Sequence, residues 1–273
     1  MTKFILLIII IISSLSCNAQ KNIEKFEFDD LGIVVEKFDS ENVDENRYNH
    51  NNSIYTVGRK FTFSYFYADK TGAKYLMTKN GLNDWGFEKM EIKDPKSIFE
   101  IVLSVNSGLS PFIQQLPDYN QTVITYDFKL YDGSLWTNEM TGIIENSKNI
   151  WMHPPRTDFF KILEINPFPY IKAPFKIGNE WTWKLKFGDH WKDKRWLLWQ
   201  GENENIYSYK ITNKVKLKTK LGILDCFIVV GEAKSSLGKT NLKSYFNEKF
   251  GFVKLDYTNI DGTKTIIELI STE

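Results

Sequence analysis

The stretch from Ile177 to Trp199 holds five of the chain's eight tryptophans, and any fold of this chain must bury part of that aromatic surface. Its first half alternates Trp181, Trp183, Leu185 and Phe187 with Thr182, Lys184 and Lys186. A period of two places the apolar set on one face of an extended chain. The pattern therefore predicts a strand with one side in the core.

After Gly188 the alternation breaks, and three more tryptophans follow among charged residues. Trp191, Trp196 and Trp199 fit either one side of a short helical turn or the lip of a hairpin. Interleaved with Arg195 and two lysines, these indoles can stack on sugars, lie at a membrane interface, close over an apolar ligand, or simply pack within the fold. Trp191, Arg195, Trp196 and Trp199 are therefore candidate ligand-binding residues.

The chain opens with Lys3 and an unbroken apolar run from Phe4 to Ile12, followed by small residues that lead to Cys17. This order predicts an export signal over residues 1–19, and the run is too short to span a bilayer. Ser-Leu-Ser-Cys resembles the lipobox of bacterial lipoproteins, which predicts lipidation of Cys17, for example with palmitate. The alternative is cleavage after Ala19. Either way we expect a cell-envelope protein, as an outer-membrane lipoprotein or in the periplasm.

Composition excludes several classes of protein. Either cleavage leaves Cys226 as the only cysteine, so the mature chain has no internal disulfide and is stabilised by packing. The 35 basic and 34 acidic residues balance, which argues against a nucleic-acid groove. Neither a H-E-x-x-H motif nor a calcium-loop spacing occurs, so we expect no metal and no cofactor.

Alternating segments recur along most of the chain. Clear examples are Gly58 to Tyr67, Thr122 to Tyr131 and Leu135 to Ile144, and a meander with glycine turns is predicted from Ile206 to Ile270. Aromatic residues make up 15% of the chain, which suits a sheet with a large core. The sequence predicts a mostly β fold, a curved antiparallel sheet or open half-barrel with one or two short helices.

Two segments carry helix signals. Asp94 can cap a helix that begins at Pro95 and ends before Gly108, and we expect a helix there, although its β-branched residues also allow a strand. The apolar side of that helix would be Ile98, Ile101, Val102 and Val105. Further on, Thr157 can cap a short helix that Asn166-Pro167 ends.

This second helix lies in a proline-rich connector, which divides the chain. We expect a tether with a first strand over residues 20–53 and an N-terminal β half over residues 54–153. The connector takes residues 154–175, and a C-terminal β-meander half takes residues 176–273.

His153 and Arg156 flank two prolines at the start of this connector. His153 can act as a general base and Arg156 can hold an anionic group; the alternative is structural hydrogen bonding. No serine or cysteine in a nucleophile-elbow sequence accompanies them, so we assign no catalytic residue and expect no enzymatic activity. Asp189, Asp193 and Glu202, near the tryptophans, are either carboxylates of a sugar site or solvated loop charges.

Four short motifs carry a family resemblance. They are Gly178 to Trp181, Gly222 to Cys226, Tyr245-Phe246 and Gly251 to Val253. In this order they resemble a family of exported bacterial proteins of unknown function that is expected to fold like the lipoprotein carriers LolA and LolB. The resemblance covers roughly Lys176 to Ile270. It implies a curved sheet wrapped partly round a helix, with a concave apolar face that can hold acyl chains, and it implies no catalytic residue.

These observations predict an exported, membrane-anchored lipoprotein that binds a hydrophobic or amphipathic, lipid-like ligand in a concave sheet face without chemistry. One alternative is an envelope carbohydrate-binding protein or glycan hydrolase that uses the tryptophan cluster. Another is a structural envelope component without a small ligand. The expected partners are the membrane, through the anchor, and a lipid or a glycan, but no nucleic acid.

Overall fold

The computed structural model of this chain describes residues 26–28, 34–36, 52–81, 84–107, 121–145 and 147–273. The predicted leader, with Cys17 and Ala19, lies outside the described residues. No helix in the described part of the chain is long and apolar enough to cross a bilayer.

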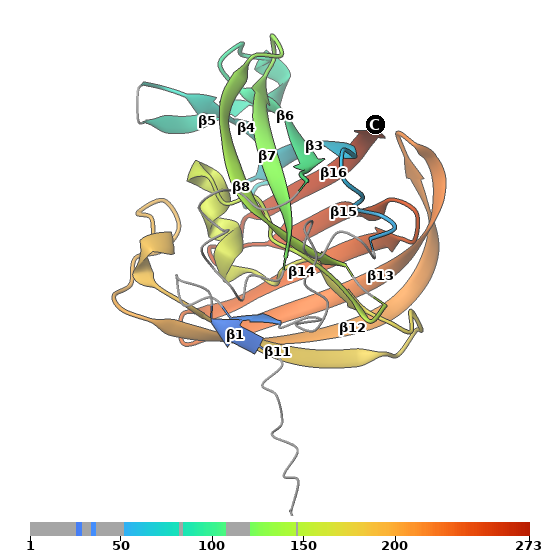
Figure 1. Cartoon of the computed structure of the whole chain (residues 1–273). Helices are drawn as coiled ribbons and strands as arrows, with labels where there is room; N and C mark the ends of the chain where they lie inside the picture. Colours follow the sequence, from blue (N-terminus) through green and yellow to red (C-terminus); the bar gives the residue numbers. More distant parts are fainter. Residues whose placement is uncertain (1–25, 29–33, 37–51, 82–83, 108–120, 146) are drawn as a thin grey trace, which may run out of the picture.

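Most of the described chain forms one antiparallel sheet of 14 strands (Figure 1). The strand order is β10-β9-β8-β7-β6-β3-β16-β15-β14-β13-β12-β11, and β4 and β5 extend β3 as a side hairpin. The strands are β3 (Lys60–Ala68), β4 (Lys74–Lys79), β5 (Trp85–Lys89), β6 (Ile98–Val105), β7 (Thr122–Leu130), β8 (Leu135–Glu145), β9 (Asn149–Met152), β10 (Tyr170–Lys172), β11 (Glu180–Phe187), β12 (Asn203–Thr219), β13 (Gly222–Ser235), β14 (Gly238–Asn247), β15 (Gly251–Thr258) and β16 (Lys264–Thr272). A separate pair joins β1 (Phe26–Phe28) to β2 (Val34–Glu36).

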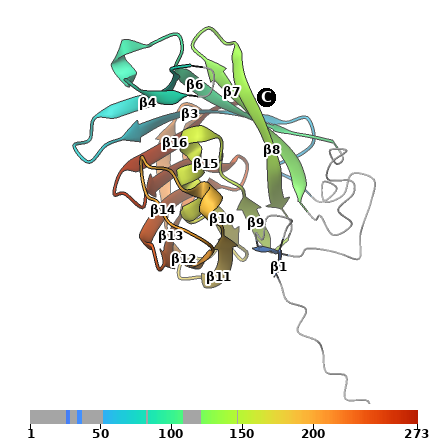
Figure 2. The ribbon, with the colours of Figure 1, turned by 90° about the vertical axis from the view of Figure 1, so that its left-hand side faces the viewer.

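The sheet curls until its two ends nearly meet (Figure 2). The end strands are β10 and β11, and across the seam the ring centroids of Tyr170 and Trp181 lie 5.6 Å apart. The Asn179 side-chain amide also donates to the Lys172 carbonyl oxygen, at 3.2 Å. The prediction of a mostly β, curved antiparallel sheet is therefore confirmed.

Strand β11 buries the apolar residues of the alternating pattern that the sequence shows. Its buried side chains are Trp181, Trp183, Leu185 and Phe187, and the residues between them are exposed. Trp181 stacks on its cross-strand partner Tyr209 at 5.4 Å, and Trp183 stacks on its partner Tyr207 at 4.6 Å. Directly opposed aromatic pairs stabilise a sheet, so the predicted strand is confirmed together with its buried face.

The helix expected after Asp94 is wrong, because this segment forms strand β6 between β3 and β7. A bulge at Phe99 inserts one residue into the strand, so Ile98 and Ile101 face the core although they are three positions apart. That spacing imitates one turn of a helix. Asp94 accepts the backbone N–H of Lys96 and shapes a turn instead of capping a helix.

The helix expected after Thr157 is present as the 3₁₀ helix η2 (Asp158–Ile165). Thr157 does not cap it with its side chain; its hydroxyl donates to Glu139 on β8 instead. Two shorter 3₁₀ turns are η1 (Met90–Ile92) and η3 (Asp189–Trp191).

Helix η2 lies inside the curve of the sheet (Figure 2) and corrects the expectation of an open apolar hollow there. Its buried residues are Phe159, Phe160, Ile162, Leu163, Glu164 and Ile165, and Phe168 follows with 0% exposure. The Phe160 ring lies 5.0 Å from Tyr65 on β3 and 5.4 Å from Phe128 on β7. The concave side is thus occupied by the protein's own side chains.

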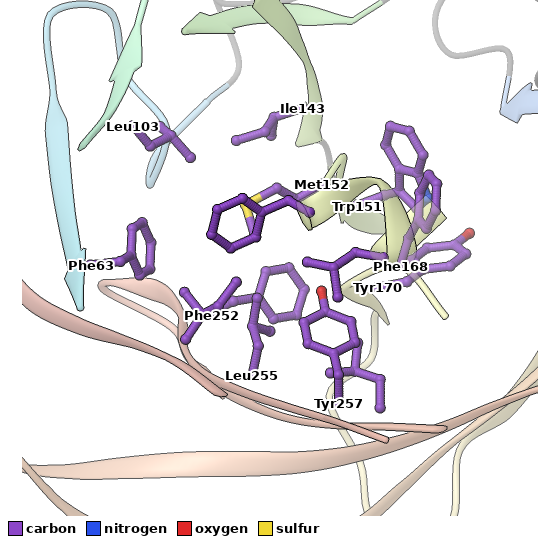
Figure 3. Packing of buried hydrophobic residues seen from close by; sticks show 14 of the residues in the cluster. Phe63, Leu103, Ile143, Trp151, Met152, Phe168, Tyr170, Phe252, Leu255 and Tyr257 are labelled. Atoms are coloured by element: carbon purple, nitrogen blue, oxygen red, sulfur yellow. The ribbon is translucent and has the colours of Figure 1, made fainter. Parts of the chain in front are cut away.

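The filled interior continues along the sheet. Figure 3 shows Leu103 and Ile143 on one side of Met152 and Phe252, Leu255 and Tyr257 on the other, with Phe63 at the left and Phe168 at the right. The sheet passes directly from β3 to β16, and the two predicted halves of the chain share this one core.

Replacing Phe160 by alanine should lower the free energy of unfolding by about 3–5 kcal/mol, because the ring leaves a closed, packed interior. Urea denaturation followed by tryptophan fluorescence measures the change. Ile223→Ala is the control: Ile223 is 71% exposed, and its loss should change the free energy of unfolding by less than about 0.5 kcal/mol. Equal losses in both variants would show that η2 is not part of the core.

Candidate functional site

The three tryptophans after Gly188 are buried. Trp191, Trp196 and Trp199 are exposed by 6%, 9% and 8%. Trp199 packs edge-on against Phe187 of β11, with ring centroids 5.9 Å apart. The indoles therefore close this end of the sheet and do not form a platform in contact with solvent.

Arg195, between these indoles, joins their loop to the β4–β5 hairpin. Its guanidinium lies 3.8 Å from the ring centroid of Trp85 at the start of β5. It also donates to the Trp85 carbonyl oxygen at 3.3 Å and pairs with Asp193 at 2.9 Å and Asp84 at 3.5 Å. The rings of Trp196 and Trp85 are also stacked, with centroids 6.4 Å apart, so two residues of the loop hold the Trp85 indole.

A pocket of about 290 Å³ opens beside this contact. Its lining residues are Gly81, Asp84, Trp85, Trp136, Thr137, Thr157 and Asp158. They come from the β4–β5 hairpin, from β8 and from the start of η2. Trp136 is only partly buried and sits at an irregularity in the pairing of β7 and β8. The pocket therefore combines an accessible indole, a second indole held by Arg195, and polar side chains.

Glu139 does not line this pocket, but it lies next to the pocket wall, because it is hydrogen-bonded to the lining residue Thr157. It is on the same face of β8 as Thr137, two residues earlier, because side chains alternate along a strand. One carboxylate oxygen accepts the Arg156 backbone N–H at 2.8 Å, and the other accepts the Thr157 hydroxyl. Burial raises the pKa of Glu139 from 4.5 to about 7, and these hydrogen bonds offset part of the rise.

Asp158 carries a second carboxyl at the pocket wall. Its φ of 52° is in the left-handed region, which an aspartate adopts at a conformational cost. Burial raises its pKa, opposed by the nearby charges of Lys161 and Arg195. Asp84 and Asp158 thus offer carboxylate oxygens at the wall of one aromatic pocket. No group of three potential metal ligands occurs among the described residues.

The predicted pair His153 and Arg156 separates in the structure. His153 is 3% exposed, with its Nδ1 3.7 Å from Glu164 Oε1 and its ring 4.8 Å from Trp151, so it belongs to the core. Arg156 borders the pocket through its backbone contact with Glu139, and its guanidinium donates to the Met140 carbonyl oxygen at 3.4 Å.

The loop acids of the sequence hypothesis are engaged locally. Asp189 pairs with Lys192 at 2.9 Å, and Asp193 pairs with Arg195. Of the predicted site residues, Arg195 and Arg156 therefore lie next to the pocket, while Trp191, Trp199 and His153 do not face it.

Sequence reasoning missed Asp84, Trp85, Trp136, Glu139 and Asp158. They lie in separate segments, and no local motif connects them. One available signal was the single tryptophans near two predicted turns, Trp85 after Asn80-Gly81 and Trp136 after Asp132-Gly133.

Comparison with known proteins finds only distant likenesses. No protein-family model matches the chain, and no curated protein matches it. Among solved structures, an exported protein with a YmcC-like fold from Bacteroides fragilis is 10% identical, with a TM-score of 0.39 over 84% of this chain and 99% of that one.

Two further structures are similar to the same degree. A lipoprotein from Parabacteroides distasonis is 10% identical, with a TM-score of 0.40 over 85% of this chain and 100% of that one. The hypothetical lipoprotein YmcC from Escherichia coli is 6% identical, with a TM-score of 0.33 over 78% of this chain and 84% of that one. Superpositions this loose support no inference about function.

The Glu139 carboxyl should titrate with a midpoint near 7, well above its ordinary 4.5, because burial disfavours its charged form. Since the folded state binds this proton more tightly than the unfolded state does, stability falls as the pH rises from about 4.5 to about 7. Carbon-13 NMR of the side-chain carboxyl, assigned by its loss in Glu139→Gln, measures the midpoint. The melting temperature of Glu139→Gln should lack this part of the pH dependence. A midpoint below about 5 would contradict the buried position.

Proposed function

We propose that this chain is a binding protein of the bacterial cell envelope that holds a polar, hydroxyl-rich ligand of the glycan class, without chemistry, in the pocket beside Trp85 and Trp136. The observation that carries the proposal is the meeting of the partly exposed Trp136 indole with Asp84 and Asp158 around one cavity of about 290 Å³, which the buried Trp85 also lines.

The chemistry of these groups fits a sugar ring. The C–H face of a pyranose is apolar and packs against an indole, while its hydroxyls donate to carboxylate oxygens. A few fixed polar groups beside aromatic surface are what small-ligand sites use to set orientation. Trp85 is already held by Arg195 at 3.8 Å and by Trp196, so its position does not depend on the ligand.

A lipid-like ligand in the concave face is less well supported. An acyl chain placed there would have to displace the buried Phe159, Phe160 and Phe168. The proposed likeness to the LolA and LolB half-barrel therefore extends to the curved sheet around a helix and not to an open cargo space.

The location in the envelope is part of the same proposal. Its support is the apolar run from Phe4 to Ile12 and the lipobox-like approach to Cys17, which would anchor the protein through a lipid such as palmitate. The outer membrane and the periplasm remain the two proposed locations.

A glycan hydrolase is the second candidate, because Asp158 provides a carboxyl in the pocket and burial raises the pKa of Glu139, beside the pocket wall, to about 7. Release of reducing ends from envelope glycans, absent in Glu139→Gln, would favour hydrolysis. Binding without turnover supports the first proposal.

Trp136→Ala should weaken glycan binding about tenfold, since losing one stacking platform removes about 1–1.5 kcal/mol. Isothermal titration calorimetry with soluble oligosaccharides from the native envelope measures the affinity. Tyr245→Ala is the matched control, because Tyr245 lies on the outer face of β14, away from the pocket, and the affinity should not change. Equal affinities in wild type and Trp136→Ala would exclude this pocket as the glycan site.

Native mass spectrometry of protein purified from its own membranes identifies the ligand class. A bound oligosaccharide supports the proposal, and a co-purified lipid contradicts it in favour of the lipid-binding alternative. A ligand-free mass, together with no heat of binding for any glycan, would indicate a structural envelope component.

A further inference from the structure

Strands β12 and β13 are 17 and 14 residues long and extend past their neighbours. β11 pairs with β12 only as far as Lys210, and β14 pairs with β13 only from Phe227 onward. Residues 212–225, here called the hairpin extension, therefore pair only with each other, and the hairpin curves away beside the sheet (Figure 1).

The two sides of the hairpin extension differ sharply in chemistry. Leu217 and Leu224 face each other across the strands and pack against the core, and Leu217 lines a small cavity with Val253 and Leu269. This apolar side is therefore attached to the body of the protein. Because side chains alternate, the other side faces outward, except at its base, where the Lys214 ammonium lies 4.4 Å from the ring centroid of the buried Phe227. Lys218 and Lys220 also border the small cavity.

That outward side is a row of lysines. Lys214, Lys216 and Lys218 alternate along β12, Lys220 follows in the turn, and all four are exposed. Ile223, which faces Lys218 across the strands, is 71% exposed. The solvent-exposed apolar side chain of Ile223 thus lies beside the lysine row.

The lysines of this row differ from a paired set elsewhere on the sheet. Five lysines there pair with acids on neighbouring strands: Lys184 with Glu204, Lys210 with Glu180, Lys239 with Glu232, Lys254 with Glu268 and Lys264 with Asp256. Lys243 on β14 instead lies over the Tyr245 ring. In the described part of the chain, no acid forms an ion pair with any lysine of the row. Asp225, opposite Lys216, is the one acid on this side of the hairpin extension.

From this contrast we infer that the lysine row is a docking surface for an anionic phospholipid bilayer. Lysines attract anionic headgroups, and an exposed isoleucine among them can enter the interface below the phosphates. The apolar side chain favours a bilayer over a purely polar polyanion, which would leave Ile223 in water.

The inference agrees with the proposed lipid at Cys17. A chain of residues 18–51 can extend at most on the order of 100 Å from the anchor, which keeps the body close to the membrane. At the high local concentration that a tether creates, a weak surface contact is sufficient to orient the protein. The role as a second contact rests on the proposed anchor, but the surface itself can be tested without it.

The test is flotation of the chain from Gln20 with vesicles of phosphatidylethanolamine containing about 30% phosphatidylglycerol, against neutral phosphatidylcholine vesicles. This chain keeps the whole described core, which begins at Ile54. Wild type should bind the anionic vesicles and dissociate in about 1 M salt, which screens charges beyond about 3 Å.

Two matched variants distinguish an effect of the lysine row on vesicle binding from an effect of the protein's net charge. Replacing Lys214, Lys216, Lys218 and Lys220 by glutamine should lower the partition coefficient by about tenfold or more. Replacing Lys184, Lys210, Lys239 and Lys264 by glutamine removes the same charge from paired positions and should lower it less than about twofold. Ile223→Ser should weaken binding severalfold, and unchanged melting temperatures show that each variant is folded.

Several results would overturn the inference. They are equal binding to neutral and anionic vesicles, equal losses in the two lysine variants, or binding to soluble alginate with no binding to anionic vesicles, which would make the partner a polyanionic glycan. Trp136→Ala should leave vesicle binding unchanged, so failure of the glycan proposal and failure of this one are distinguishable.

Discussion

The structure depends on how the inner face of a strongly curved sheet is covered. Fourteen antiparallel strands that bend until β10 approaches β11 enclose a space too narrow for a second sheet and too apolar for water. The connector between the two halves fills this space with the aromatic rings of η2 and Phe168. Phe160 contacts β3 and β7, and Phe168 lies 5.9 Å from Trp183 on β11, so one short segment joins the two halves of the chain.

Because side chains fill the interior, the candidate site lies at the rim of the curved sheet. The pocket forms where η2 begins, because Asp158 turns the chain with a left-handed φ and Thr157 is held by its hydrogen bond to Glu139 on β8. Strand β8 supplies Trp136 at a pairing irregularity, and Arg195 fixes Trp85 from the other side. Because strands and core contacts hold each of these groups, the pocket is organised before a ligand arrives.

The lysines on the outer surface of the sheet fall into two groups. At five positions of the sheet, lysines and acids pair across neighbouring strands, which lowers the local charge. Where β12 and β13 outrun their neighbours, alternating lysines follow one another without an ion pair among the described residues. The same period of two that buries Leu217 thus presents Lys214, Lys216 and Lys218 on the side away from the body.

Sequence alone determined the class of fold and most of the strands. The alternation predicted the strands of the C-terminal meander, and in β11 it predicted the buried face as well, because a period of two is a local property of the chain. It failed at β6, where the bulge at Phe99 gives a strand the spacing of a helix. For the indoles after Gly188 it left several roles open, since a local pattern does not show whether Trp191 and Trp199 turn inward.

Only the tertiary structure decided where the candidate site lies and what its groups can do. Asp84, Trp136 and Asp158 come from separate segments of the chain, and the fold brings them to one pocket. The raised pKa of Glu139 comes from burial, which depends on neighbours more than fifteen residues away, such as Thr157. Strand patterns follow from the order of residues, whereas solvation and proximity follow from the packing of distant segments, which no local pattern encodes.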